Sequence, residues 1–312
     1  MKTITSFIAV CSTVFTLGFL GAPAHAANST ATRPVTPITH MKNPALARTQ
    51  SARPANSVPS TTFAYHGGPV MTEPVNLYVI WYGQWPSLSR KKPVVQRVLR
   101  TLGQSTYFGI NTAYTQSNGK HVTHTVHLAA ETVDAYSSGK VLQDASVATI
   151  VGRNISSTPS FRTNANTADK NGIYIVISSS DVRNTSGFLT TYCGWHSSGT
   201  MGNIVTKFIF AGDPSANLIV CAPPTNRDHS PNDYPGMDAA ASTIAHEISE
   251  TVTDPELNAW FDDNHMENAD LCAWQYGKTY STNQAQANLQ FEWRDYLIQE
   301  NWNLTTHSCS LN

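Results

Sequence analysis

The residues best suited to chemistry form a short motif, His246-Glu247-Ile248-Ser249-Glu250, in the last quarter of the chain. His246 and Glu250 are four residues apart, so on a helix they lie one turn apart on the same face and could grip one cation together. Glu247 lies one step round the helix, near enough to reach a water molecule held by that cation. We therefore interpret His246 and Glu250 as metal ligands and Glu247 as a general base.

This motif resembles the H-E-x-x-H helix of zinc peptidases, with Glu250 in place of the second histidine. In the glutamate-type enzymes a downstream glutamate is the third ligand, which predicts that role for Glu267. Asp270, one turn further on, completes the predicted metal site by orienting that ligand. Asp254 and His265 are less favoured ligands. Zinc is the predicted ion. Calcium and manganese remain alternatives, because a carboxylate oxygen is a harder ligand than an imidazole nitrogen and suits these ions.

The motif lies in an acidic segment that contains no basic residue. Residues 228–277 hold 11 of the 21 acidic residues of the chain and no lysine or arginine. Surface acids are normally interspersed with basic partners, so an acid-only segment in a chain with 13% charged residues favours a bound cation. The alternative is a solvated acidic surface on which Glu247 and Glu250 are ordinary helix residues.

The motif must be positioned by a helix, which we predict over residues 238–253. Asp238 is the predicted N-cap, and Asp254 before Pro255 should end the helix. A recurrence every four residues predicts a buried stripe made of Ile244, Ile248 and Val252.

Other patterns predict the elements around this helix. Strands are expected at 75–82, 121–128, 172–178 and 204–210, and helices from Pro93 to Leu102 and over 142–154. Strands that alternate with helices predict an α/β fold, a layered mixed sheet with helices and a zincin-like core; α+β is the alternative. In the strand at 121–128, His121 and His127 share one face and His124 the other, which argues against a three-histidine site there.

The N-terminal residues have the pattern of an export signal. Lys2, an apolar run from Phe7 to Leu20 and Ala24-His25-Ala26 predict a cleavable signal peptide over 1–26. Its apolar run is shorter than the ~20 residues of a spanning helix, so no membrane anchor is expected after cleavage. Residues 27–60 are rich in small and polar residues and predict a disordered leader or pro-segment. Residues 61–312 then form one domain.

Export sets the expected state of the cysteines. Cleavage removes Cys11 and leaves four, which suggests two disulfide bonds among three arrangements. We favour Cys193–Cys221 and Cys272–Cys309, because each joins sequence neighbours. Sequons that would suit glycosylation in a eukaryotic host occur at Asn28, Asn154, Asn184 and Asn303. A net charge of −1 without a basic stripe argues against nucleic acid as a partner.

Several further stretches resemble the EXORDIUM-like, or phosphate-induced, family of secreted proteins. They are Tyr65 to Met71, Val79 to Gly83, Tyr174-Ile175-Val176, Gly187-Phe188, Cys193-Gly194, Phe210-Ala211-Gly212, Thr253-Asp254-Pro255, Arg294 to Leu297 and Cys309. The resemblance implies a secreted, extracellular or cell-wall protein; plant members are linked to growth and have no established enzymatic activity. Those plant members lack a counterpart of His246-Glu247, which implies that this branch kept a metal site.

The sequence leaves open whether the chain is an enzyme. The leading hypothesis is a secreted zinc-dependent, peptidase-like hydrolase acting on an extracellular peptide or wall polymer. The alternatives are a non-enzymatic wall or matrix protein with a structural acidic helix, and a carbohydrate-binding module.

Overall fold

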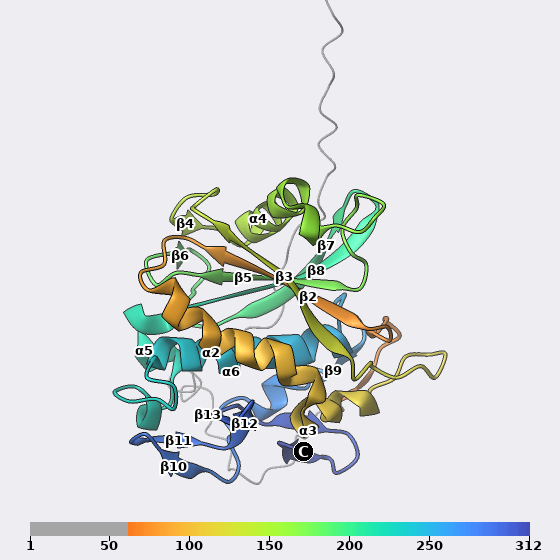
Figure 1. Ribbon diagram of the computed structural model, residues 1–312. Coiled ribbons are helices and arrows are strands. Elements are labelled where there is room, and N and C mark those ends of the chain that lie inside the picture. Colours follow the sequence, from red (N-terminus) through yellow and green to blue (C-terminus); the bar gives the residue numbers. More distant parts are fainter. Residues whose placement is uncertain (1–61) are drawn as a thin grey trace, which may run out of the picture. The chain divides into compact units, whose positions relative to one another are not determined.

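The structure, a computed structural model, describes residues 62–312, and the predicted signal peptide and leader lie outside the described residues. Its centre is a mixed five-stranded sheet, in which the strands are ordered β3-β2-β5-β8-β7 (Figure 1). Four strands are parallel and the edge strand β7 runs antiparallel to β8. The strands are β2 (Val75–Tyr82), β3 (Val126–Asp134), β5 (Gly172–Ser178), β7 (Trp195–Met201) and β8 (Ile204–Gly212).

Helices cover both faces of this sheet. Helix α4 (Asp144–Ser157) lies on one face, and α2 (Leu88–Thr101) and α6 (Pro235–Thr253) lie on the other (Figure 1). The strand period of two explains the division: in β2, Leu77 and Val79 pack toward α2 and α6, whereas Tyr78 and Ile80 pack toward α4. These layers confirm the predicted α/β fold; its zincin-like character stays a prediction.

The remaining elements are short helices, 3₁₀ turns and two-stranded pairs. The short helices are α3 (Thr106–Gly109), α5 (Leu218–Cys221) and six 3₁₀ turns, at Leu102–Gln104, Ile110–Ala113, Pro159–Phe161, Pro214–Ala216, Pro224–Asn226 and Asp270–Cys272. The short strand pairs are β1 (Ala64–Tyr65) with β9 (Trp260–Phe261), β4 (Val141–Leu142) with β6 (Arg183–Asn184), β10 (Tyr280–Thr282) with β11 (Ala285–Ala287), β12 (Leu289–Phe291) with β13 (Arg294–Tyr296), and β14 (Asn301–Asn303) with β15 (Ser308–Ser310). Among residues 62–312, none of the helices has the length and apolar character needed to span a membrane.

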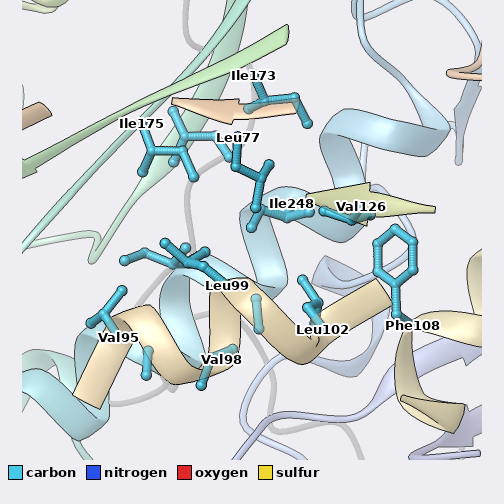
Figure 2. Close-up of a cluster of buried hydrophobic side chains, with 14 of the residues drawn as sticks. Leu77, Val95, Val98, Leu99, Leu102, Phe108, Val126, Ile173, Ile175 and Ile248 are labelled. Carbon is cyan, nitrogen blue, oxygen red and sulfur yellow. The ribbon is translucent and has the colours of Figure 1, made fainter. Parts of the chain in front are cut away.

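The core beneath the sheet is built where α2 and α6 meet the strands. Figure 2 shows Val95 and Leu99 of α2 facing Leu77 and Ile175 of the sheet, with Ile248 of α6 beside them. All of these side chains are fully buried. Burial of one such side chain contributes roughly 1.5–3 kcal/mol, so this layer fixes the position of α6 firmly against the sheet.

The strongest sequence patterns gave accurate boundaries. Strands β2 and β5 coincide with the predicted 75–82 and 172–178, and every residue of β5 is buried, as its unbroken apolar run indicates. Strand β8 begins at the predicted Ile204 and continues to Gly212. Both predicted disulfides, Cys193–Cys221 and Cys272–Cys309, are present.

Two predicted boundaries were wrong. Helix α2 begins at Leu88, five residues before Pro93, so the proline lies inside the helix instead of opening it. Strand β3 begins at Val126, not at His121, because the preceding residues pair elsewhere: the Thr123 amide donates to the Met71 carbonyl. The rings of His121 and His124 bond the backbone carbonyls of Thr112 and Ser105.

Helix α6 also differs from the prediction. It starts at Pro235, whose fixed φ suits the first helical position, and Asp238 lies inside the first turn instead of capping it. The Asp238 carboxylate accepts hydrogen bonds from the Asn232 backbone and side chain. Burial is not confined to a stripe, because all residues from Gly236 to Thr253 are buried. The helix therefore has no solvated face on which acidic residues could lie.

Two of the sequons are unsuited to glycosylation. The side chains of Asn154 and Asn184 are 5% exposed, and their amide groups donate to Asp134 and Asp144. Asn303 is half-buried, and Asn28 lies outside the described residues.

Candidate metal centre

The centre of α6 presents three ionisable side chains that are almost completely buried. His246 and Glu247 are 0% exposed and Glu250 is 1% exposed. One helical turn brings His246 Nε2 to 3.0 Å from Glu250 Oε1. The predicted spacing of these residues is therefore confirmed, although the surroundings are a protein interior instead of an acidic surface.

A loop after β9 adds two carboxylates. Asp270 Oδ1 lies 3.6 Å from His246 Nε2, and the Asp270 amide donates to Glu250 Oε1 at 3.1 Å. Glu267, three residues earlier, offers a carboxylate oxygen within 4.8 Å of one oxygen of Glu250, within reach of a shared cation. The Cys272–Cys309 disulfide fixes the chain two residues after Asp270.

Buried amides hold this loop against α6. Asn268 and Asn301 both donate to Asn111 Oδ1, at 3.0 and 2.8 Å, and the Asn111 amide donates to Ser249 Oγ at 3.3 Å. Ser249 lies between the motif residues on α6, so the network links the loop directly to the motif. Satisfied networks of this kind rigidify a site.

His196, which is not among the ligands predicted from the sequence, also belongs to the cluster. Its Nε2 lies 2.9 Å from Glu267 Oε2 and 3.9 Å from Glu250 Oε2, and the residue is 0% exposed. In β7, Trp195 faces the α4 layer, so the strand period turns His196 toward α6. The turn at Gly202-Asn203, ahead of the predicted strand at 204, is a hairpin signal that would have revealed β7 and this orientation.

Several cluster atoms have no hydrogen-bond partner within residues 62–312. These buried atoms include both carboxylate oxygens of Glu247, Oε2 of Glu250, and Nδ1 of both histidines. Leaving a buried polar group unpaired costs about 1–3 kcal/mol, and more for a charged group. The cluster therefore has the polar character of a site that binds an ion or ordered water.

Electrostatics in the cluster are dominated by burial and by mutual repulsion of the acids. Burial, reinforced by the charge of Glu250, raises the pKa of Glu247 well above its usual value. Burial also raises the pKa of Glu250 to about 7. For His196, burial favours the neutral form, but the carboxylates of Glu267, Glu250 and Glu247 together outweigh it and raise the pKa to about 10. Without a metal ion, the cluster must hold protons to limit its negative charge.

The ligand atoms fall into two sets that share Glu250. One set contains His196, Glu250 and Glu267, and the other contains His246, Glu247 and Glu250; within each set the atoms lie within 4.8 Å of one another. The predicted ligands His246 and Glu267 thus lie on opposite sides of Glu250. Asp254 belongs to neither set. Its carboxylate accepts hydrogen bonds from the backbone amides of Asn258 and Ala259, just after the end of α6.

Gly194 packs against the motif, and a larger residue should disturb it. A Cβ there would lie 2.6 Å from Thr243 Cγ2 and 3.1 Å from Glu247 Oε1. We expect Gly194→Ala to lower the free energy of unfolding by about 1–3 kcal/mol, as overpacking does. Gly199→Ala on the same strand is the control, because its Cβ would meet Phe208 at an ordinary 3.6 Å. Equal stabilities of the two variants in urea denaturation would contradict this prediction.

The metal-free protein should lose stability as pH rises from about 5 to about 8. Burial raises the pKa of Glu250 from 4.5 to about 7 and, with the charge of Glu267, that of Asp254 from 3.8 to about 8. Their stabilising contribution is full below the unfolded values and is lost as pH rises through the folded ones. Zinc binding requires deprotonated ligands, so the gain in melting temperature on adding zinc should grow over this range. Calorimetry with and without zinc tests both trends, and a metal-free melting temperature that rises over the range would refute the first.

Comparison with known proteins assigns the chain to a family. The family model described as "Phosphate-induced protein 1 conserved region" matches residues 63–312. Protein EXORDIUM-like 5 of Arabidopsis thaliana is 28% identical over 341 aligned positions, covering 95% of this chain and 88% of the relative. Protein EXORDIUM-like 3 of the same plant is 29% identical over 283 positions, covering 79% and 82%. No solved structure matches. The chain therefore belongs to the phosphate-induced, EXORDIUM-like family, as the ordered series of motifs in its sequence predicts.

Proposed function

We propose that this protein is a secreted, metal-dependent hydrolase of peptidase-like type. The observation that carries the proposal is the state of Glu247: its carboxylate is fully buried, neither oxygen has a hydrogen-bond partner within the described chain, and it adjoins His246 and Glu250. Perturbed titratable groups grouped in this way are typical of functional sites.

The roles follow from the geometry. His246 and Glu250 are the ligands that α6 supplies, and the loop adds the carboxylate of Asp270. Glu267, the third ligand that the sequence predicts, lies with His196 beside Glu250. A bound divalent cation would lower the pKa of a water molecule and polarise a substrate carbonyl. Glu247 is the general base, because its carboxylate adjoins His246 and Glu250 and neither of its oxygens has a hydrogen-bond partner within residues 62–312.

The donor set favours zinc, with manganese second. Two imidazoles, from His196 and His246, belong to the cluster along with the carboxylates. Imidazole suits zinc and manganese binds readily to carboxylates, whereas calcium takes six to eight oxygen ligands. Calcium, which the acidic sequence alone left as an alternative, is therefore the least favoured ion.

The proposed location is outside the cell, and the proposed substrate is an extracellular peptide or wall polymer. The two disulfide bonds support this location, because disulfides form and persist in oxidising compartments. Cleavage after Ala26 is the proposed processing step. N-terminal sequencing of protein from the culture medium should begin at Ala27, and retention of Met1 in exported protein would refute cleavage.

The test of function combines metal content and activity in one preparation. Mature protein, purified without a metal-binding tag or chelator, should contain stoichiometric metal by elemental analysis. It should hydrolyse members of a fluorogenic peptide library, and a chelator should abolish that activity reversibly. Metal-free protein whose stability is unaffected by chelators would end the proposal.

A second function is favoured by a specific observation, the complete burial of the cluster. Structural metal sites are closed, whereas catalytic sites keep one position open to substrate. Residues His196, Glu247 and Glu250 are all at most 1% exposed. A non-enzymatic wall protein stabilised by a structural ion would contain metal and show no hydrolysis in the same assay.

A further inference from the structure

We propose that the cluster holds two divalent cations bridged by the carboxylate of Glu250. The proposal rests on the proposed function, whose catalytic ion is the one beside His246, and adds a second ion beside His196. The juxtaposition that supports it is the presence of a different histidine at each oxygen of Glu250.

The first oxygen of Glu250 faces the ligands of one ion. Oε1 lies 3.0 Å from His246 Nε2, and Asp270 Oδ1 lies 3.6 Å from the same nitrogen. Glu247 belongs to this set. One imidazole with carboxylates from α6 and from the loop forms a mixed donor set of the kind that zinc or manganese accepts.

The second oxygen of Glu250 faces the ligands of the other ion. Oε2 lies 3.9 Å from His196 Nε2, which is itself 2.9 Å from Glu267 Oε2. Oε2 is buried and has no hydrogen-bond partner within residues 62–312, so Asp270 and His246 do not occupy it. These atoms come from β7, from α6 and from the loop, and they converge although His196 and Glu267 are 71 residues apart in sequence.

The charge of the cluster favours two ions over one. Four carboxylates, from Glu247, Glu250, Glu267 and Asp270, carry four negative charges when ionised, and histidines that bind metal are neutral. One divalent cation leaves two negative charges in a site where these side chains are at most 6% exposed. Two divalent cations neutralise them. Because uncompensated buried charge is costly, the pair of ions is the balanced state.

A carboxylate bridge has a chemical consequence for the proposed hydrolase. Two-metal sites hold their ions ~3.5–4 Å apart and stabilise both the attacking and the leaving oxygen of a hydrolytic step. In this arrangement Glu250 positions the pair, and Glu247, which adjoins the His246 side, remains the general base.

The test is metal stoichiometry with a spectroscopic readout of the bridge. The mature protein should bind two equivalents of zinc, and protein loaded with manganese should show magnetic coupling between two ions by electron paramagnetic resonance. Either His196→Ala or Glu267→Gln should reduce binding from two equivalents to one and abolish the coupling. Glu267→Gln keeps the side-chain shape, so it serves if the alanine variant does not fold. His121→Ala, at an exposed histidine, is the control and should keep both ions.

The outcomes separate this proposal from the proposed function. One equivalent in the unaltered protein, unchanged by Glu267→Gln, overturns the second ion and makes His196–Glu267 a hydrogen-bonded pair that orients the site, while a single-metal hydrolase survives. Two equivalents without magnetic coupling overturn the bridge. Absence of metal overturns both proposals together.

Discussion

Removing metal from the mature protein is expected to lower its melting temperature by about 8–16 °C. An ion at 1,000 times its dissociation constant adds about 4 kcal/mol to the stability of the folded state. For a domain of about 250 residues, each kcal/mol shifts the melting temperature by roughly 2–4 °C. The effect should be large here because metal loss leaves Glu247 and Glu250 as mutually repelling buried acids.

Differential scanning calorimetry before and after chelation, and after zinc is restored, measures this effect. Glu250→Gln is the matched variant, because Glu250 belongs to both ligand sets and its amide cannot replace the carboxylate. The melting temperature of this variant should lie below that of the metal-loaded parent, and adding zinc should not change it. An unchanged melting temperature after chelation of protein shown to contain metal would contradict the stabilising role of the ion.

Glu247→Gln is expected to lower kcat by about 10²–10⁴-fold while the protein keeps its metal. General bases contribute acceleration of this order, and an amide cannot accept the proton. The fold should survive, because glutamine has the shape of glutamate and removes a buried charge whose oxygens lack partners in the described chain. The metal-free form of this variant should therefore be at least as stable as the metal-free parent.

Kinetics, elemental analysis and calorimetry on the same variant separate the two proposed functions. Glu256→Gln, at a half-buried position just beyond the helix, is the control and should leave kcat unchanged. Loss of metal together with activity would make Glu247 a ligand instead of a base. An unchanged kcat in metal-loaded Glu247→Gln would remove it from the mechanism.

The local part of the candidate site was predictable because it depends on one helical turn. The spacing of His246 and Glu250 fixes their proximity wherever the helix lies, and Pro255 marks the helix end through its effect on the preceding residue. The unbroken apolar run of β5 likewise identifies a central strand. Such features require no knowledge of the remaining chain.

Sequence-based predictions failed where residues that are close in space, but not in the motif itself, decide the structure. Asp238 has the chemistry of an N-cap, but Pro235 starts the helix earlier and Asn232 takes up the carboxylate. The solvated acidic surface, which the sequence left as an alternative, does not describe α6, because the sheet and α2 pack against a helix that is buried from Gly236 to Thr253.

By itself, the sequence identified the family, the central strands and the three chemically suited side chains on one turn of α6, and it favoured the disulfide pairing that the structure shows. The sequence also predicted Glu267 and Asp270 as partners, but only the tertiary structure decided how they lie around Glu250 and that His196 joins them. His196 reaches the cluster because β7 pairs antiparallel with β8 at the edge of the sheet. Glu267 and Asp270 reach it because buried amides and a disulfide bond hold their loop against α6. The physical reason is distance along the chain: helical spacing fixes contacts over four residues, whereas contacts across 50 or more depend on how every intervening element packs.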